Sequence, residues 1–126
     1  MRLLITLSIF MILFIIFSAY IQNQILLTAT NIREQLPQIS EAINAENWQI
    51  AEEHVISLQK YWNEIQDYWD LIIVHREIED VELLFSRLLS YIKSQEKPSA
   101  LAELAALDVY FSHIYRNHMF NIQNVF

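Results

Sequence analysis

Four histidines and 15 acidic residues are the side chains of this chain that could bind a metal or move a proton. The densest polar cluster lies at residues 75–80, where His75 and Glu79 stand four positions apart and would share one face of a helix. Glu77 lies between them, and His113 could approach from a later helix. The cluster could hold a metal ion or a ligand's charged group, or sense pH near the ordinary histidine pKa of about 6.5. The candidate site residues are therefore His75, Glu77, Glu79 and His113.

The spacing of these residues does not match the metal sites that helical proteins usually build. Di-iron bundles use Glu-x-x-His, and no histidine here follows an acidic residue by three positions. A structural role at a helix junction is the alternative, because Glu77 and Glu79 suit a first helical turn and His75 could bond to backbone groups across a kink. We favour this structural role and expect no metal site.

The chain lacks the residue types that common catalytic and cofactor-binding sites need. The chain has no cysteine, which excludes disulfides, thiolate zinc sites and cysteine nucleophiles. It has no glycine, so phosphate-binding loops and dinucleotide-binding motifs are excluded as well. No serine can sit on a strand-to-helix elbow, because no strand is expected. We therefore predict a protein that is not an enzyme, with no catalytic residue and no cofactor.

The elements that must position the polar cluster are helices. With no glycine and two prolines in 126 residues, tight sheet turns are disfavoured and an all-α fold remains. Apolar residues recur at alternating spacings of three and four, which is typical of helices that bury one face. The predicted buried positions are Ile25, Ala29, Ile32, Leu36, Ile39 and Ile43; Trp48, Ala51, Val55, Leu58, Trp62, Ile65, Trp69 and Ile72; Val74, Ile78, Val81, Phe85, Leu88 and Ile92; and Ala100, Leu104, Leu107, Phe111 and Ile114.

Helix boundaries follow from prolines and capping residues. Pro37 predicts a kink or break near residues 35–37, because proline removes a backbone donor and restricts the residue before it. Asn47 predicts a helix start at Trp48, and Pro98 predicts another at Pro98 or Ser99. The three tryptophans share one face, and we interpret them as core rather than as a ligand cage. The expected architecture is a roughly four-helix antiparallel bundle.

The N-terminal run from Leu3 to Ile21 is uncharged and long enough to cross a membrane. Its 19 residues would span about 28 Å as a helix. A secretory signal peptide is the alternative, but Phe17 stands two residues before Ala19, where a cleavage site needs a small residue. We predict a transmembrane anchor at residues 1–21 that contacts the lipid bilayer through residues 3–21. Residues 22–126 then form the helical bundle.

Charge predicts the orientation of the chain and excludes one class of partner. Arg2 and the α-amino group precede the run, and no charge follows it before Arg33, so the N-terminus should be cytoplasmic and the bundle outside the cell membrane. Without Arg2, the chain carries 7 basic and 15 acidic side chains, which predicts no binding to nucleic acid. The apolar C-terminus, ending in Val125 and Phe126, should dock on the bundle or on a partner.

The chain resembles a known family over most of its outer region. The resemblance rests on Trp48, Trp62, Tyr68-Trp69, Leu71-Ile72, His75-x-Glu77-Ile78, Tyr91-Ile92, Leu101 to Leu107, His113-Ile114 and Asn124-Val125-Phe126. The family comprises small, N-terminally membrane-anchored helical proteins of endospore-forming Firmicutes with a domain of unknown function (DUF4363-like). It implies an anchor plus a helical domain, a shared polar network at His75, Glu77 and His113, and no enzyme activity. Its members are often encoded beside multi-pass membrane proteins, which implies a membrane-protein partner.

Two functions remain open on these observations. The first is a non-enzymatic interaction or accessory subunit of a membrane protein complex. The alternative is an extracytoplasmic bundle that senses a metal or small ligand through the His/Glu cluster. The apolar C-terminus and the lack of any catalytic set favour the first.

Overall fold

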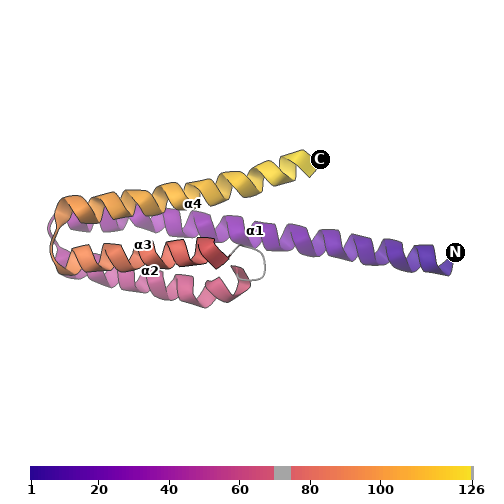
Figure 1. Cartoon of the computed structure of the whole chain (residues 1–126), viewed down its shortest axis with the longest axis horizontal. Helices are drawn as coiled ribbons and strands as arrows, with labels where there is room; N and C mark the ends of the chain where they lie inside the picture. The colour runs from indigo at the N-terminus through magenta and orange to yellow at the C-terminus, as the bar shows by residue number, and fades with distance from the viewer. Residues whose placement is uncertain (70–74, 126) are drawn as a thin grey trace.

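The computed structural model describes the backbone of residues 1–69 and 75–125 and the side chains of residues 1–67, 77–114 and 116. These residues form four α-helices and no strand: α1 (Arg2–Asn44), α2 (Trp48–Trp69), α3 (His75–Lys93) and α4 (Lys97–Val125). Figure 1 shows them as an antiparallel bundle from which the N-terminal part of α1 projects. The predicted all-α class and the long apolar N-terminal helix are confirmed.

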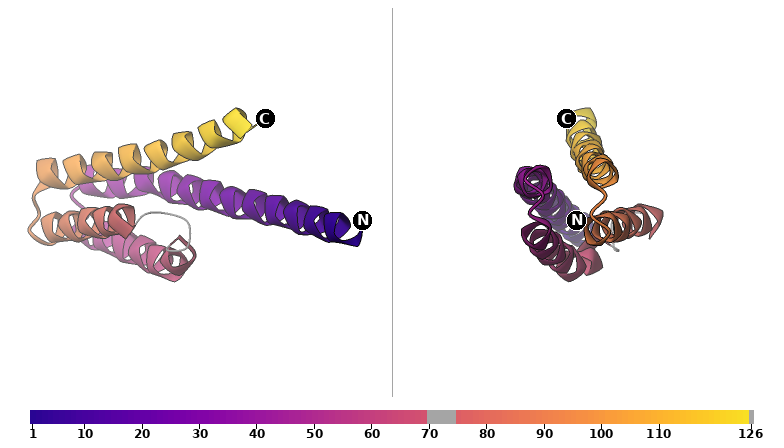
Figure 2. Two further views of the ribbon diagram at one scale, coloured as in Figure 1. Left: turned by 45° about the vertical axis from the view of Figure 1, so that its right-hand side comes forward. Right: turned by 90° about the vertical axis from the view of Figure 1, so that its left-hand side faces the viewer.

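The helices pack as a ring in which each one has two neighbours. Helix α1 contacts α2 and α4, and α3 contacts the same two helices from the opposite side. Viewed from the end of the bundle, the four helices surround one shared interior (Figure 2). Short connections between α1 and α2 and between α3 and α4 lie at the end away from the N-terminus (Figure 1).

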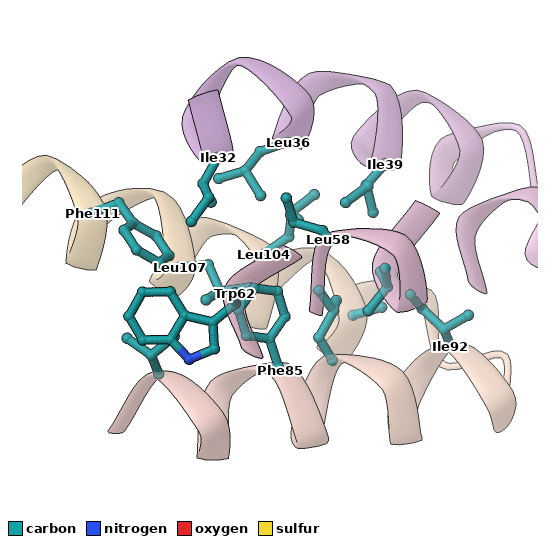
Figure 3. Packing of buried hydrophobic residues seen from close by; sticks show 14 of the residues in the cluster. Ile32, Leu36, Ile39, Leu58, Trp62, Phe85, Ile92, Leu104, Leu107 and Phe111 are labelled. Atoms are coloured by element: carbon teal, nitrogen blue, oxygen red, sulfur yellow. The ribbon is translucent and has the colours of Figure 1, made fainter. Parts of the chain in front are cut away.

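One apolar core fills this interior, and it follows the predicted spacing. The predicted positions of α1 from Ile25 to Ile43 are buried, as are those of α3 from Ile78 and those of α4 from Ala100. In α2, Ala51, Val55, Leu58 and Trp62 are buried, whereas Trp48 and Ile65 are half-buried. Figure 3 shows Trp62 beside Phe85 and Phe111, and its ring meets that of Phe111 edge-on at 5.7 Å between centroids. Trp62 is thus a core residue, as predicted.

Some predicted core positions lie outside the described residues. These are Ile72 and Val74 between α2 and α3, together with the side chain of Trp69. The prediction that Val125 and Phe126 dock on the bundle or on a partner also concerns side chains outside the described set.

The predicted break near Pro37 is wrong, because α1 continues as one helix from Arg2 to Asn44. Proline in a helix interior removes one hydrogen bond and costs about 3 kcal/mol. The ring of Pro37 faces solvent, whereas Leu36 and Ile39 on either side of it are buried in the core. Burial of an aliphatic side chain stabilises by about 1.5–3 kcal/mol, so two such neighbours offset the lost hydrogen bond.

The two connections that the structure describes make the same turn without glycine. After α1, the amide of Glu46 donates to the carbonyl of Ile43 at 3.0 Å and that of Asn47 donates to Ala42 at 2.9 Å. After α3, Gln95 and Glu96 donate in the same pattern to Ile92 and Tyr91. This is the Schellman motif, whose left-handed residue is usually glycine. Here Glu46 and Gln95 take that position, with φ of 57° and 54°.

Helix α2 begins at Trp48, as Asn47 predicts, and α4 begins at Lys97, one residue before the predicted start. Pro98 lies in the first turn of α4, where its missing N–H costs nothing. The Lys97 ammonium also donates to the carbonyl of Asn44 at 3.1 Å. This contact joins the start of α4 to the carboxyl end of α1, where the helix dipole favours a positive charge.

Candidate functional site

An open groove of about 700 Å³ lies between α3 and α4. Its apolar lining includes three alanines and Val109 of α4 together with Leu83 and Leu84 of α3. Leu83 is 48% exposed and Val109 is 66% exposed, although both are large apolar residues. We call this surface the α3–α4 groove; it is lined by Glu77, Asp80, Leu83, Leu84, Arg87, Ala102, Ala105, Ala106, Val109, Tyr110, His113 and Ile114.

The α4 side of the groove comes from a second apolar stripe. Ala102, Ala105, Ala106 and Val109 follow at spacings of three, one and three, so they lie on one side of the helix, opposite the buried seam that contains Leu104 and Leu107. Methyl side chains leave the helix backbone close to the surface. The groove can therefore admit a side-chain ridge from another helix.

One end of the groove is polar and negatively charged. Glu77 and Asp80 of α3 and His113 of α4 line this end together with Tyr110. The Tyr110 hydroxyl donates a hydrogen bond of 2.9 Å to the backbone carbonyl of Glu77. Burial of the phenol raises the pKa of Tyr110 above its ordinary value of 10.0, and the charges of Glu77 and Asp80 raise it further. Tyr110 therefore stays neutral and fastens α4 to the first turn of α3.

The structure brings together only part of the predicted His/Glu cluster. Glu77 and His113 line the same groove, so the expected approach of α4 to the start of α3 is confirmed. Glu79 is exposed and is not part of the groove, and the side chain of His75 lies outside the described residues. Among the residues that the structure describes, no three histidine and acidic side chains are grouped closely enough to hold a metal ion.

Two polar residues of the groove, Tyr110 and Arg87, were not predicted from the sequence. Tyr110 directly precedes the core position Phe111, and its hydrogen bond depends on how α3 and α4 face each other, which spacing within one helix does not indicate. Arg87 lies one residue before the core position Leu88 and resembles any solvent-facing charge on α3. The alanine stripe of α4 did leave a sequence signal, because apolar residues also repeat at helical spacing on the side of α4 opposite the main seam.

A second, smaller groove lies between α1 and α4, and an ion pair lines it. The guanidinium Nε of Arg33 lies 3.0 Å from a carboxylate oxygen of Asp108, and the groove beside this pair includes Pro37 and Ala105. Both charged side chains are more than a third exposed, so the pair contributes at most about 1 kcal/mol to stability. The pair shows that Arg33 of α1 and Asp108 of α4 lie at the same level along the bundle.

The N-terminal part of α1 has no cover within the described structure. Every large apolar residue from Leu3 to Phe17 is at least half exposed, and the first buried residue of α1 is Ile25. Over the described residues, α1 is the one helix that is long and apolar enough to cross a membrane. Such a helix is compatible with a membrane anchor or a signal sequence.

The fold and the groove define a helical-bundle protein with a long apolar N-terminal helix. The chain belongs to the family described as "Domain of unknown function (DUF4363)", whose model matches residues 19–125. The match covers the bundle and begins near the end of the apolar run. No curated protein and no solved structure matches the chain significantly.

Proposed function

We propose that this protein is a non-enzymatic accessory subunit, held in the cell membrane by α1, whose bundle binds a membrane-protein partner outside the cell. The observation that carries the proposal is the construction of α1. One unbroken helix exposes its apolar residues from Leu3 to Phe17 and then contributes Ile25 to Ile43 to the bundle core. Since lipid is the environment that such an apolar surface requires, the bundle would be held within a few helical turns of the bilayer.

The α3–α4 groove supports the choice of partner. Exposed apolar residues and alanines that line the same groove favour contact with another helix, because a helix ridge fills such a groove better than a small polar molecule does. A bundle held at the membrane surface meets the outer segments of integral membrane proteins most often. A helical outer segment of a multi-pass membrane protein is therefore the proposed occupant.

Photo-crosslinking in intact membranes tests this proposal. A photoreactive amino acid replaces Val109 in the groove, and a matched variant carries it at Glu53, an exposed position of α2. We expect an adduct from position 109 only, with a multi-pass membrane protein identified in it by mass spectrometry. The substitution Leu83→Glu should remove the adduct by placing a charge in the groove. An adduct with a soluble protein or with a second copy of this chain, or equal adducts from both positions, would contradict the proposal.

A sensor of metal ions or small ligands is the second candidate. It is favoured by the meeting of Glu77, Asp80 and His113 at one end of the groove. The absence of a metal-binding group of three among the described residues speaks against a metal and leaves a cationic ligand as the better form of this candidate.

A further inference from the structure

Helix α4 is longer than the other two helices that follow the anchor. It has 29 residues, whereas α2 has 22 and α3 has 19. Figures 1 and 2 show that the extra turns of α4 pass the ends of α2 and α3 and point toward the N-terminal end of α1. The bundle therefore has a second helix that extends toward the region where α1 is apolar and exposed.

The contact between Arg33 and Asp108 sets the level that α4 reaches. Because the two helices are antiparallel and rise about 1.5 Å per residue, equal numbers of residues from this pair reach equal levels. Ile21, the last residue of the apolar run, and Phe120 each lie about 18 Å from the pair along their helices. The helical residues after Phe120, up to Val125, extend about 7 Å further toward the level of the apolar run.

The composition of this segment differs from that of the rest of the bundle. The chain contains 15 acidic residues, and none of them follows Asp108. Residues 116–126 contain Arg116, His118 and five large apolar residues, which are Met119, Phe120, Ile122, Val125 and Phe126. Apolar residues mixed with amides and a basic residue are typical of helices that enter the headgroup region of a bilayer.

Nothing in the described structure encloses the α1 surface at this level. Phe14, Phe17 and Tyr20 of α1 are each more than 60% exposed, although α4 ends near their level. Helices α2 and α3 do not reach it, since Trp69 ends α2 and His75 begins α3. The end of α4 and the exposed part of α1 therefore extend into the same environment.

We propose that residues 116–125 of α4 enter the headgroup and upper acyl region of the outer leaflet, the same leaflet from which α1 emerges. The proposal rests on the membrane anchoring of α1 proposed above. Lipid at this depth accepts apolar side chains and asparagine together, and the lack of acidic groups avoids charge burial. Two helices then meet the membrane, which restricts rotation of the bundle about α1 and points the α3–α4 groove in a defined direction.

The absence of native cysteine allows a depth measurement on the full chain. Single cysteines replace Ile122 near the end of α4, Ser94 in the distal turn and Phe14 in the apolar run, and each carries a polarity-sensitive fluorophore. The proteins are reconstituted in phosphatidylcholine vesicles with nitroxide groups at the lipid headgroup or deep in the acyl chain. Circular dichroism checks that each variant keeps its helices, and Asn124→Cys replaces Ile122→Cys if that variant does not fold.

We expect headgroup nitroxides to quench most of the emission at position 122 and little at position 94, while deep nitroxides quench position 14. Adding Phe120→Asp to the position 122 variant should reduce its quenching. Aqueous iodide, a quencher that stays in water, is the matching probe of solvent exposure. If lipid nitroxides quench position 14 but only iodide quenches position 122, the inference about α4 is overturned while α1 is still a membrane anchor. Shielding of position 122 from both lipid and iodide also overturns it, because protein then covers the segment. If deep nitroxides do not quench position 14, α1 is not a membrane anchor, and the proposed function itself is contradicted.

Discussion

At the residue scale, Glu46 and Gln95 show how the chain turns without glycine. Both adopt a left-handed backbone conformation at the end of a helix, which costs a residue with a Cβ about 1–2 kcal/mol. The Schellman hydrogen bonds and the burial of the flanking helices impose that conformation. Each turn therefore stores strain that a single substitution can remove.

Glu46→Gly should raise the free energy of unfolding by about 1 kcal/mol. Glycine takes the left-handed conformation at no steric cost, and this gain exceeds the entropy that glycine adds to the unfolded chain. Chemical denaturation of the detergent-solubilised protein, followed by circular dichroism, measures the change. Glu52→Gly in the interior of α2 is the matched control and should lower stability by about 1 kcal/mol. Destabilisation by both substitutions would show that the Glu46 turn is not strained.

Tyr110 predicts a pH dependence of stability. Its pKa is raised in the folded protein by burial and by Glu77 and Asp80, so the unfolded chain loses the phenol proton first as the pH rises. The stabilisation by neutral Tyr110 is complete below pH 10, the ordinary pKa, and is lost as the pH rises toward the folded-state pKa. Stability should therefore fall above pH 10.

Tyr110→Phe should reduce this alkaline loss. It should also lower stability at neutral pH by about 1 kcal/mol, because the hydrogen bond to the Glu77 carbonyl is absent. Denaturation curves between pH 7 and 11 measure both effects, with Tyr91→Phe in α3 as the control. If Tyr110→Phe loses as much stability above pH 10 as the natural chain does, groups other than Tyr110 cause that loss.

His113 tests the metal-binding form of the second proposal at the same scale. If the groove binds protein, His113→Ala should leave the zinc content of the purified protein unchanged and alter stability by less than about 0.5 kcal/mol, because the side chain is exposed. Elemental analysis and thermal unfolding with and without added zinc measure these quantities. Zinc that co-purifies with the natural chain and is lost in His113→Ala would favour the sensor.

At the scale of elements, α1 combines two environments in one helix. Its first half has no buried residue, and its second half contributes eight buried residues to the bundle. Pro37 lies in the second half, on the solvent side, between buried neighbours. Sequence rules treat proline locally and predicted a break, whereas burial of Leu36 and Ile39 holds the helix continuous.

Pro37→Ala should stabilise the bundle by about 1–3 kcal/mol. Alanine restores the amide that can donate to the Arg33 carbonyl, and it removes the steric conflict of the ring with that carbonyl. Denaturation at neutral pH measures the gain, and Pro98→Ala in the first turn of α4 is the control, with a change below about 1 kcal/mol. A loss of stability in Pro37→Ala would mean that the ring itself packs favourably.

At the scale of the whole molecule, the proposed anchor and the bundle predict a topology. Leu3→Cys and Ser94→Cys place single thiols at opposite ends of the structure. Under the proposed topology, in which the flanking charge of Arg2 keeps the N-terminus in the cytoplasm, a membrane-impermeant maleimide should label Ser94→Cys and not Leu3→Cys in intact cells. Both should react after detergent solubilisation, which removes the bilayer around position 3. If only Leu3→Cys is labelled in intact cells, the orientation of the chain is opposite to the one proposed.

The amino-acid sequence by itself determined the helical class, the buried face of each helix and the starts of α2 and α4. These properties depend on contacts within one helix, where side-chain spacing and capping act over a few residues. It also placed Glu77 and His113 in one candidate site, because short connections between helices predict antiparallel neighbours.

Tertiary structure decided what depends on two helices at once. The continuity of α1 through Pro37, the hydrogen bond from Tyr110 to Glu77 and the exclusion of Glu79 from the groove all depend on how α3 and α4 pack and on what α1 buries. The same holds for the level that α4 reaches, which follows from the contact of Arg33 with Asp108. Spacing along one helix indicates a buried face, but only packing sets the register and the partner of that face.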